Sequence, residues 1–371
     1  MQRTIPFFNY QALFTPHEEE LMPVLLDVMR RGAFILQKDL TEFEANLAKF
    51  VGAKYAFGVA NGTDALIIAL RAAGIKPGDE VILPSHTYIA TAAAVHFVGA
   101  TPVLVECGTD HLIDPASVKA AVTPKTRAIM PVQLNGRTSD MEALQKIADE
   151  HNLLIIEDAA QGLGSKYKGQ CAGTFGVAGT FSFYPAKVLG CFGDGGAIVT
   201  NDDAVAEQVM LLRDHGRNEE GLIVEWGLNS RLDNLQAAIL NFKLGTFPQD
   251  IERRREIARR YQAGLSEISD LVLPPDPDSD SNHYDVYQNY EIESSHRDAL
   301  KDHLKKDGIG TIIQWAGKAV HQFEDLKFNV SLPFTEKMFE RCLMLPMNTS
   351  LSDEDIEYIC ASIRHFYRLA A

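Results

Sequence analysis

The sequence predicts an α/β fold, with a mostly parallel central sheet flanked by helices and a smaller C-terminal α+β lobe. Short apolar runs typical of buried strands alternate with helical patterns over the first 248 residues. From about residue 249 the character changes, and a highly charged helical pattern is followed by a Pro/Asp/Ser-rich loop. A chain of 371 residues with 46% hydrophobic residues suits two lobes. We therefore predict a large domain over residues 1–248 and a small domain over residues 249–371.

The predicted elements follow in order along the chain. Helical patterns are expected at 17–31, 40–51, 88–98, 115–121, 202–214 and 234–243, with a further one that has apolar residues at 66, 67 and 70. Apolar runs predict strands at 55–59, 81–83, 101–105, 128–132, 153–157, 179–183 and 197–200. The C-terminal part is expected to hold helices at 251–267, 297–306 and 353–368, strands at 286–292 and 310–314, and a loop at 273–281.

Lys187 is the first candidate for a catalytic residue. It is the one lysine between residues 180 and 196, a run that is otherwise mostly apolar and punctuated by glycine. Burial lowers the pKa of an amine, and a neutral amine can attack a carbonyl carbon. This environment suits a lysine that forms a Schiff base. The alternative is a lysine whose ammonium group reaches water from the end of a buried strand.

Asp158 is the second candidate, because it follows a predicted buried strand with four aliphatic residues. Ligands of open α/β sheets bind at the carboxyl ends of the strands, so this carboxylate is placed to pair with a protonated ring nitrogen. Gln161, about one turn later, is expected to face the same cleft. The alternative for Asp158 is a cap at the start of the next helix.

A phosphate-binding turn is expected around Gly62 and Thr63. The turn-prone residues 61–63 precede a helical pattern. Free N–H groups at the start of a helix favour an anion such as phosphate. Ordinary helix capping is the alternative explanation for these residues.

Together the features have a specific order: a phosphate turn, an aspartate at a strand end, and a serine five residues before a lysine. In this order the chain resembles the fold type I pyridoxal-phosphate (PLP) enzymes and, more narrowly, the sugar aminotransferases of the DegT/DnrJ/EryC1/StrS family. The resemblance covers essentially the whole chain. Its motifs are Phe34-Ile35, Phe43-Glu44, Pro84-Ser85-His86-Thr87-Tyr88, Glu157-Asp158-Ala159-Ala160-Gln161, Ser182-Phe183-Tyr184-Pro185-Ala186-Lys187, Gly227-Leu228-Asn229-Ser230-Arg231-Leu232-Asp233 and Leu345-Pro346-Met347.

The resemblance implies a role for each matching residue. Lys187 is similar to the lysine that forms the Schiff base with PLP, and Asp158 to the aspartate that hydrogen-bonds the pyridine nitrogen. Gln161 matches the glutamine near the phenolic oxygen of the ring, and Tyr88 matches the aromatic residue that stacks on it. The phosphate-binding positions are matched by Gly62, Thr63, Ser182 and Asn229. In the family this asparagine comes from the neighbouring subunit, so the resemblance implies a homodimer with shared active sites.

The sequence departs from the family pattern where the substrate is expected. After residues 128–132 the family usually shows His-x-Tyr-Gly, whereas residues 133–136 are Gln-Leu-Asn-Gly. The segment 314–322 replaces a stretch that more often contains proline. These departures concern the choice of sugar more than the reaction. The candidates for the substrate pocket are Gln133, Asn135, Trp315 and His321, of which Trp315 and His321 also suit a core position.

Composition excludes several other classes. The net charge of −15 argues against a nucleic-acid or anionic-membrane surface. The five cysteines are scattered, which indicates reduced thiols in the cytoplasm and neither a disulfide framework nor a metal site. No apolar run reaches the roughly 18 residues of a membrane span, and the first residues show no secretory signal. We therefore expect a cytoplasmic protein without a metal.

The resemblance implies a transaminase that moves an amino group from L-glutamate to a nucleotide-linked keto-sugar, with pyridoxamine phosphate (PMP) as the intermediate form of the cofactor. The expected acceptor is a 3-keto or 4-keto 6-deoxyhexose. Its product is an amino-sugar for a surface polysaccharide, such as lipopolysaccharide O-antigen, or for a glycoside. The alternatives are a PLP-dependent sugar dehydratase, in which histidine replaces the lysine, and a non-catalytic regulatory protein on the same fold.

Overall fold

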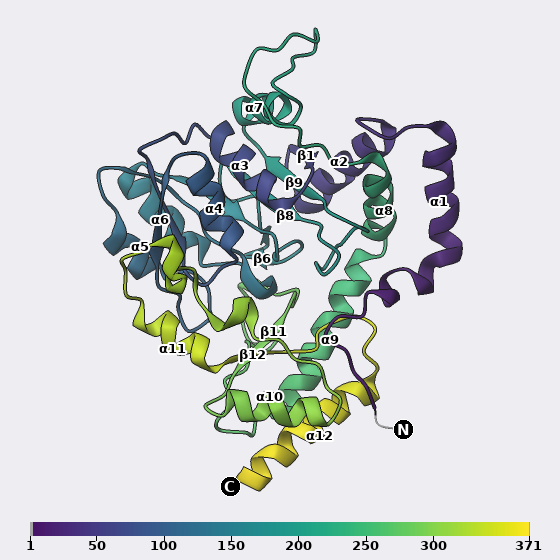
Figure 1. Cartoon of the computed structure of the whole chain (residues 1–371), viewed down its shortest axis with the longest axis vertical. Coiled ribbons are helices and arrows are strands. Elements are labelled where there is room, and N and C mark those ends of the chain that lie inside the picture. The colour runs from purple at the N-terminus through teal and green to yellow at the C-terminus, as the bar shows by residue number, and fades with distance from the viewer. Residues whose placement is uncertain (1–2, 371) are drawn as a thin grey trace.

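The computed structural model describes residues 3–370, and its centre is a seven-stranded sheet (Figure 1). The strand order is β1-β9-β8-β5-β4-β2-β3. β9 (Gly196–Thr200) is antiparallel to its neighbours β1 and β8, and the other pairs are parallel. The predicted mostly parallel sheet is confirmed. Its other strands are β1 (Tyr55–Val59), β2 (Glu80–Pro84), β3 (Thr101–Val105), β4 (Thr126–Ile129), β5 (Leu154–Asp158) and β8 (Ala178–Ser182).

Helices cover both faces of the sheet, because its strands present apolar side chains to both sides. One face is covered by α3 (Gly62–Ala72), α4 (Ile89–Phe97) and α7 (Asp203–Arg213). The other is covered by α2 (Lys38–Val51), α5 (Pro115–Ala121), α6 (Met141–His151) and α8 (Asn234–Leu244). Neighbouring residues of β5 show the alternation, since Ile155 packs in the core under α5 and α6 and Ile156 packs in the core under α3 and α4. α1 (Glu18–Arg31) lies against α8, on the right in Figure 1.

A second core lies in the C-terminal part of the chain. Here β11 (Tyr290–Glu293) pairs antiparallel with β12 (Cys342–Leu345), and α10 (Arg297–Lys306) and α12 (Asp353–Ala370) pack around the pair. We call these four elements the C-terminal lobe. α9 (Phe247–Leu265) joins the two cores, because Phe247 packs in the first and Tyr261 in the second. The predicted domain division after residue 248 falls in the first turn of α9 and stays a prediction.

Shorter elements complete the fold. A small sheet holds β10 (His283–Tyr284), β6 (Lys166–Tyr167) and β7 (Gln170–Cys171). α11 (Pro333–Arg341) leads directly into β12. α6, α11 and β12 are not among the elements predicted from the sequence. Within residues 3–370, no helix combines the length and the apolar character that a membrane span needs.

The structure corrects three of the predicted strands. The strand expected at 286–292 begins only at Tyr290, because Tyr287 has a φ of 49° and the residues around it bond to loops of the larger core. The strand expected at 310–314 is absent, and Ile312 makes a single bridge to Met344. The strand expected at 128–132 ends at Ile129, two residues before Pro131, which has no N–H to donate.

Candidate active site

A cavity of about 610 Å³ opens at the carboxyl ends of the parallel strands. This volume lies in the range of small-molecule sites, and the position is where open α/β sheets bind ligands. Most of the residues predicted from the sequence line it together: Gly62, Thr63, Tyr88, Asp158, Gln161, Ser182, Lys187 and Trp315. These residues come from the start of α3, the loop before α4, the ends of β5 and β8, and the segment 314–317 of the C-terminal part.

Asp158 ends β5 and has one side open to the cavity. Its Oδ2 accepts a hydrogen bond of 2.7 Å from Thr91 Oγ1, so the contact between the hydroxyls of Thr91 and Thr87 has Thr87 as donor. Its Oδ1 accepts the N–H of Ala160 at 3.2 Å. Burial raises the pKa of Asp158, although these hydrogen bonds and the charge of Lys187 oppose the rise. Within the described residues no ion pair is formed by this carboxylate, and a protonated ring nitrogen in the cavity would supply a close cationic partner.

Lys187 lies in the same cavity, in the loop after β8. Burial lowers the pKa of its amine to about 8, and the negative charge of Asp158 opposes the shift. A substantial fraction of the amine is therefore neutral near physiological pH, as a nucleophile or a base requires.

Gln288 holds the backbone on both sides of Lys187. Its Oε1 accepts the N–H of Val188 at 2.7 Å, and its Nε2 donates to the carbonyl of Ala186 at 2.8 Å. Gln288 is itself buried, and Arg254 donates to its carbonyl and to that of Tyr287. The segment before β11 thus fixes the loop that carries Lys187.

The orientation of the Gln161 amide follows from its partners. Its oxygen lies 2.8 Å from the backbone N–H of Asn135, which can only donate, and 3.2 Å from Nδ2 of Asn289. The Oε1 atom is therefore occupied. The NH₂ group remains as a donor for an oxygen in the cavity, such as a phenolate.

The start of α3 provides an anion site. The side chain of Asn61 caps the helix by accepting the N–H of Asp64 at 2.8 Å, which leaves the first N–H groups available to a phosphate. A Cβ at Gly62 would lie 2.8 Å from Cβ of Ser182, so glycine allows the helix to approach this serine. The charge, the shape and the donors of the cavity thus fit PLP at both of its ends.

Other predicted residues lie outside the cavity lining. Gln133 is fully buried, with its amide bonded to Glu157 and to the N–H of Ser139. His321 is buried between Ser85 and Glu336. The Asn135 side chain contacts Glu291, Asn289 and Gln314, and it lines a neighbouring pocket. Asn229 is exposed on a bridge to Asp214 and does not reach the cavity of its own chain.

Several residues of the site were not identified from the sequence. Thr91 supports Asp158, and Gln288 and Asn289 hold Lys187 and Gln161. A threonine in the first turn of α4 and two amides more than 100 positions beyond Lys187 have no local pattern that marks them.

Lys187 should capture pyridoxal phosphate with a pH midpoint near 8. Only the neutral amine attacks the aldehyde, and its pKa is about 8 instead of the usual 10.5, so the capture rate rises with pH through this lower range. Asp158→Asn removes a charge that holds the proton on Lys187, and the midpoint should move to lower pH. The measurement is the absorbance change on mixing the cofactor with cofactor-free protein at a series of pH values. A midpoint at the ordinary lysine value would contradict the assignment.

Gln288→Leu should slow this capture by about ten-fold or more at every pH. The leucine keeps the size of the side chain but leaves the N–H of Val188 and the carbonyl of Ala186 without their partner, and small displacements of a reacting group cost one to two orders of magnitude in rate. Gln249→Leu, on the exposed surface of α9, is the matched control. A Gln288→Leu protein that melts at a lower temperature but captures the cofactor at the normal rate would show a purely structural role.

Comparison with known proteins gives a consistent result. The DegT/DnrJ/EryC1/StrS aminotransferase family matches residues 16–364. A pleiotropic regulatory protein of Geobacillus stearothermophilus is 42% identical over 98% of this chain and 99% of its own. The dTDP-3-amino-3,4,6-trideoxy-alpha-D-glucose transaminase of Streptomyces venezuelae is 39% identical over 98% of this chain and 96% of its own.

Two solved structures share the fold. The S. venezuelae protein DesV, in complex with a ketimine intermediate, superposes with a TM-score of 0.94 at 38% identity and covers 98% of both chains. NtdA of Bacillus subtilis, with the bound cofactor PMP, has a TM-score of 0.91 at 29% identity and covers 98% of this chain and 85% of that chain. The fold, the cavity and the match over residues 16–364 lead to one assignment: the chain belongs to the DegT/DnrJ/EryC1/StrS aminotransferase family.

Proposed function

We propose that this protein is a PLP-dependent aminotransferase that moves an amino group from L-glutamate to a nucleotide-linked keto-sugar. The observation that carries the proposal is the presence of Lys187 and Asp158 in one cavity, beside the free N–H groups at the start of α3. The transaminase named among the relatives and the PMP-bound NtdA structure support the same reaction and cofactor.

Each residue of the cavity would bind a different part of the cofactor. The start of α3 and Ser182 would bind the phosphate. Asp158 would bind the ring nitrogen, and the NH₂ group of Gln161 would donate to the phenolic oxygen. When bound, PLP supplies an electron sink that stabilises negative charge on the carbon of the amino donor. The protein keeps this sink effective because the Asp158 carboxylate favours a protonated ring nitrogen.

Lys187 has two roles in the proposed reaction. It attaches the cofactor, and its released amine moves a proton between the donor carbon and the cofactor. An amine with a pKa of about 8 can accept and return a proton near neutral pH with little cost in either direction. The same residue serves both halves of the reaction, since amination of the keto-sugar reverses the steps that deaminate glutamate.

The acceptor belongs to the 3-keto or 4-keto 6-deoxyhexoses, and the dTDP-3-amino sugar named for the S. venezuelae relative favours the 3-keto member. Of the four substrate candidates, Trp315 is the one that lines the cavity. We assign the product to a surface polysaccharide, such as O-antigen, or to a glycoside. A cytoplasmic location remains a prediction from the sequence, and the five cysteines in the described chain are buried free thiols, as a reducing compartment favours.

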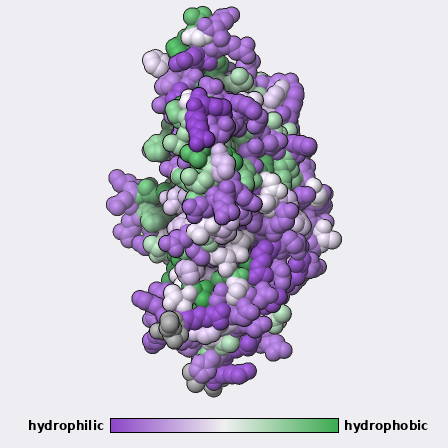
Figure 2. Space-filling model, turned by 90° about the vertical axis from the view of Figure 1, so that its right-hand side faces the viewer, coloured by the Kyte–Doolittle hydropathy of each residue, from purple (hydrophilic) through white to green (hydrophobic). Residues whose placement is uncertain are grey.

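A homodimer with shared sites is part of the proposal. The loop after α7 projects from the top of the molecule in Figure 1, and Figure 2 shows hydrophobic surface at the same end. The second half of this loop carries exposed apolar side chains: Leu222, Ile223, Val224 and Trp226. Trp226 is 87% exposed, and Tyr88 at the cavity is 56% exposed. A second copy of this chain would cover both and bring Asn229, at the base of the loop, to the phosphate of its partner.

The presence of Lys187 separates the proposal from its alternatives. A sugar dehydratase of this fold has histidine at this position, and a purely regulatory protein has no need of a buried amine facing Asp158. The regulatory name of the G. stearothermophilus relative describes that protein and does not conflict with catalysis here.

Lys187→Ala should abolish transamination of a panel of 3-keto and 4-keto dTDP-, UDP- and GDP-sugars with glutamate. It should also abolish covalent attachment of PLP, measured by peptide mass spectrometry after borohydride reduction. Lys243→Met is the matched control, because burial lowers the pKa of Lys243 to about 8 as well, while its amine donates to the carbonyl of Gly190 and does not line the cavity. Cofactor mass on the Lys243 peptide, or turnover in the alanine variant, would refute the proposal.

A further inference from the structure

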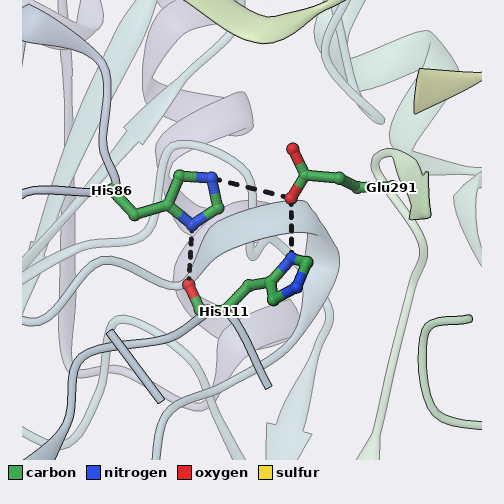
Figure 3. Close-up of side chains that lie close together, drawn as sticks. All are labelled: His86, His111 and Glu291. Carbon is green, nitrogen blue, oxygen red and sulfur yellow. Dashed lines mark hydrogen bonds and ion pairs between the residues drawn. The ribbon is translucent and has the colours of Figure 1, made fainter. Parts of the chain in front are cut away.

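Three buried side chains meet beside the cavity without a part in the proposed reaction. His86 follows β2, His111 lies in the loop after β3, and Glu291 belongs to β11. One atom of each (Nε2, Nδ1 and a carboxylate oxygen) lies within 4.8 Å of the others, and Figure 3 shows both rings directed at the carboxylate. No metal site is predicted from the sequence, in which these three residues are far apart and follow no ligand spacing.

The proton of His86 can be placed from its contacts. Its Nδ1 lies 2.9 Å from the carbonyl oxygen of His111, which can only accept, so Nδ1 carries a hydrogen. Nε2 then presents a lone pair in the neutral ring. Within residues 3–370 this atom has no hydrogen-bond partner. It is fully buried and lies 3.6 Å from Oε2 of Glu291. A lone pair that faces a carboxylate in a dry interior is unfavourable unless a cation lies between them.

The distances from the Glu291 oxygen to the two ring nitrogens suit a small metal ion. Zinc binds nitrogen and oxygen at about 2.0 to 2.2 Å in a tetrahedron, which places its ligand atoms roughly 3.3 Å apart. The distance from Glu291 Oε2 is 2.9 Å to Nδ1 of His111 and 3.6 Å to Nε2 of His86, so the observed values lie on either side of this separation. Two imidazoles and one carboxylate form a zinc ligand set that leaves a fourth position for water.

The second ring nitrogen of each histidine also has the kind of hydrogen-bond partner that is found at metal sites. A histidine that binds a metal usually donates its other N–H to a carbonyl or a carboxylate, which fixes the ring. His86 does so to the His111 carbonyl, and Nε2 of His111 lies 3.1 Å from Oε1 of Glu293. A neighbouring pocket lined by His111, Asn135 and Glu291 gives an ion a path to the cluster.

We propose that His86, His111 and Glu291 form a binding site for a divalent transition-metal ion of the zinc class. The ion replaces the proton that now bridges His111 and Glu291. It joins the C-terminal lobe, through β11, to the two loops of the larger core. His86 immediately precedes Thr87 and Tyr88 of the cavity, so the ion fixes one wall of the cofactor site.

The test is calorimetric titration of zinc chloride into holoenzyme that has been treated with a chelator and then freed of it. We expect one zinc ion per chain. His86→Gln and Glu291→Gln should each weaken binding by at least about ten-fold, which is the lower end of the cost of losing even a group behind a ligand. His96→Gln, on the exposed end of α4, is the matched control and should bind normally.

Anomalous scattering at the zinc edge, from crystals of the same holoenzyme soaked in zinc chloride, locates the ion. A peak within bonding distance of all three atoms supports the proposal. Wild-type protein that binds no stoichiometric zinc, binding that His86→Gln leaves unchanged, or a peak only in the cofactor cavity overturns it. If Glu291→Gln fails to fold, the His86→Gln titration and the position of the peak still decide the question.

Discussion

Two adjacent carboxyl groups, those of Glu157 and Asp158, are buried at the carboxyl end of β5. The site depends on which hydrogen-bond donors and charges surround each of them. Glu157 points to one face and accepts hydrogen bonds from Gln133 and from the N–H groups of Gly173, Phe175 and Gly176. Asp158 points to the other face, where it has Thr91 and the N–H of Ala160 but an open side toward the cavity. A buried carboxylate without a cation is costly. The protonated ring of the cofactor is therefore a cationic partner for Asp158, and burial without that partner raises the pKa of this carboxyl.

Much of this arrangement could be predicted from the sequence, because it rests on local patterns. The apolar run that ends at Asp158, the isolated Lys187 and the turn at Gly62 each lie at the end of a strand or the start of a helix, and strand ends meet at one edge of a parallel sheet. Gln288 and Asn289 could not be found in this way, since their partners come from loops 100 or more residues earlier. Gln133 and His321 show the opposite problem: the sequence reveals a polar residue near the site but not that its side chain turns into the protein and is fully hydrogen-bonded there.

The C-terminal lobe and the segment that leads into it contact residues of the cofactor site. The segment before β11 holds the backbone around Lys187 and the oxygen of Gln161. Glu291 of β11 faces His111 and also His86, which precedes Tyr88 in the chain. The position of this lobe thus sets the geometry of the cofactor site.

The central claim is that Asp158 keeps the ring nitrogen of the cofactor protonated. Nitrogen NMR of the holoenzyme reconstituted with ¹⁵N-labelled pyridoxal phosphate tests it most directly, because the chemical shift of the ring nitrogen reports its proton. The account predicts a protonated nitrogen in the wild-type protein across the neutral pH range and an unprotonated one in Asp158→Asn. An unprotonated nitrogen in the wild type, or a protonation state that the substitution leaves unchanged, would contradict it.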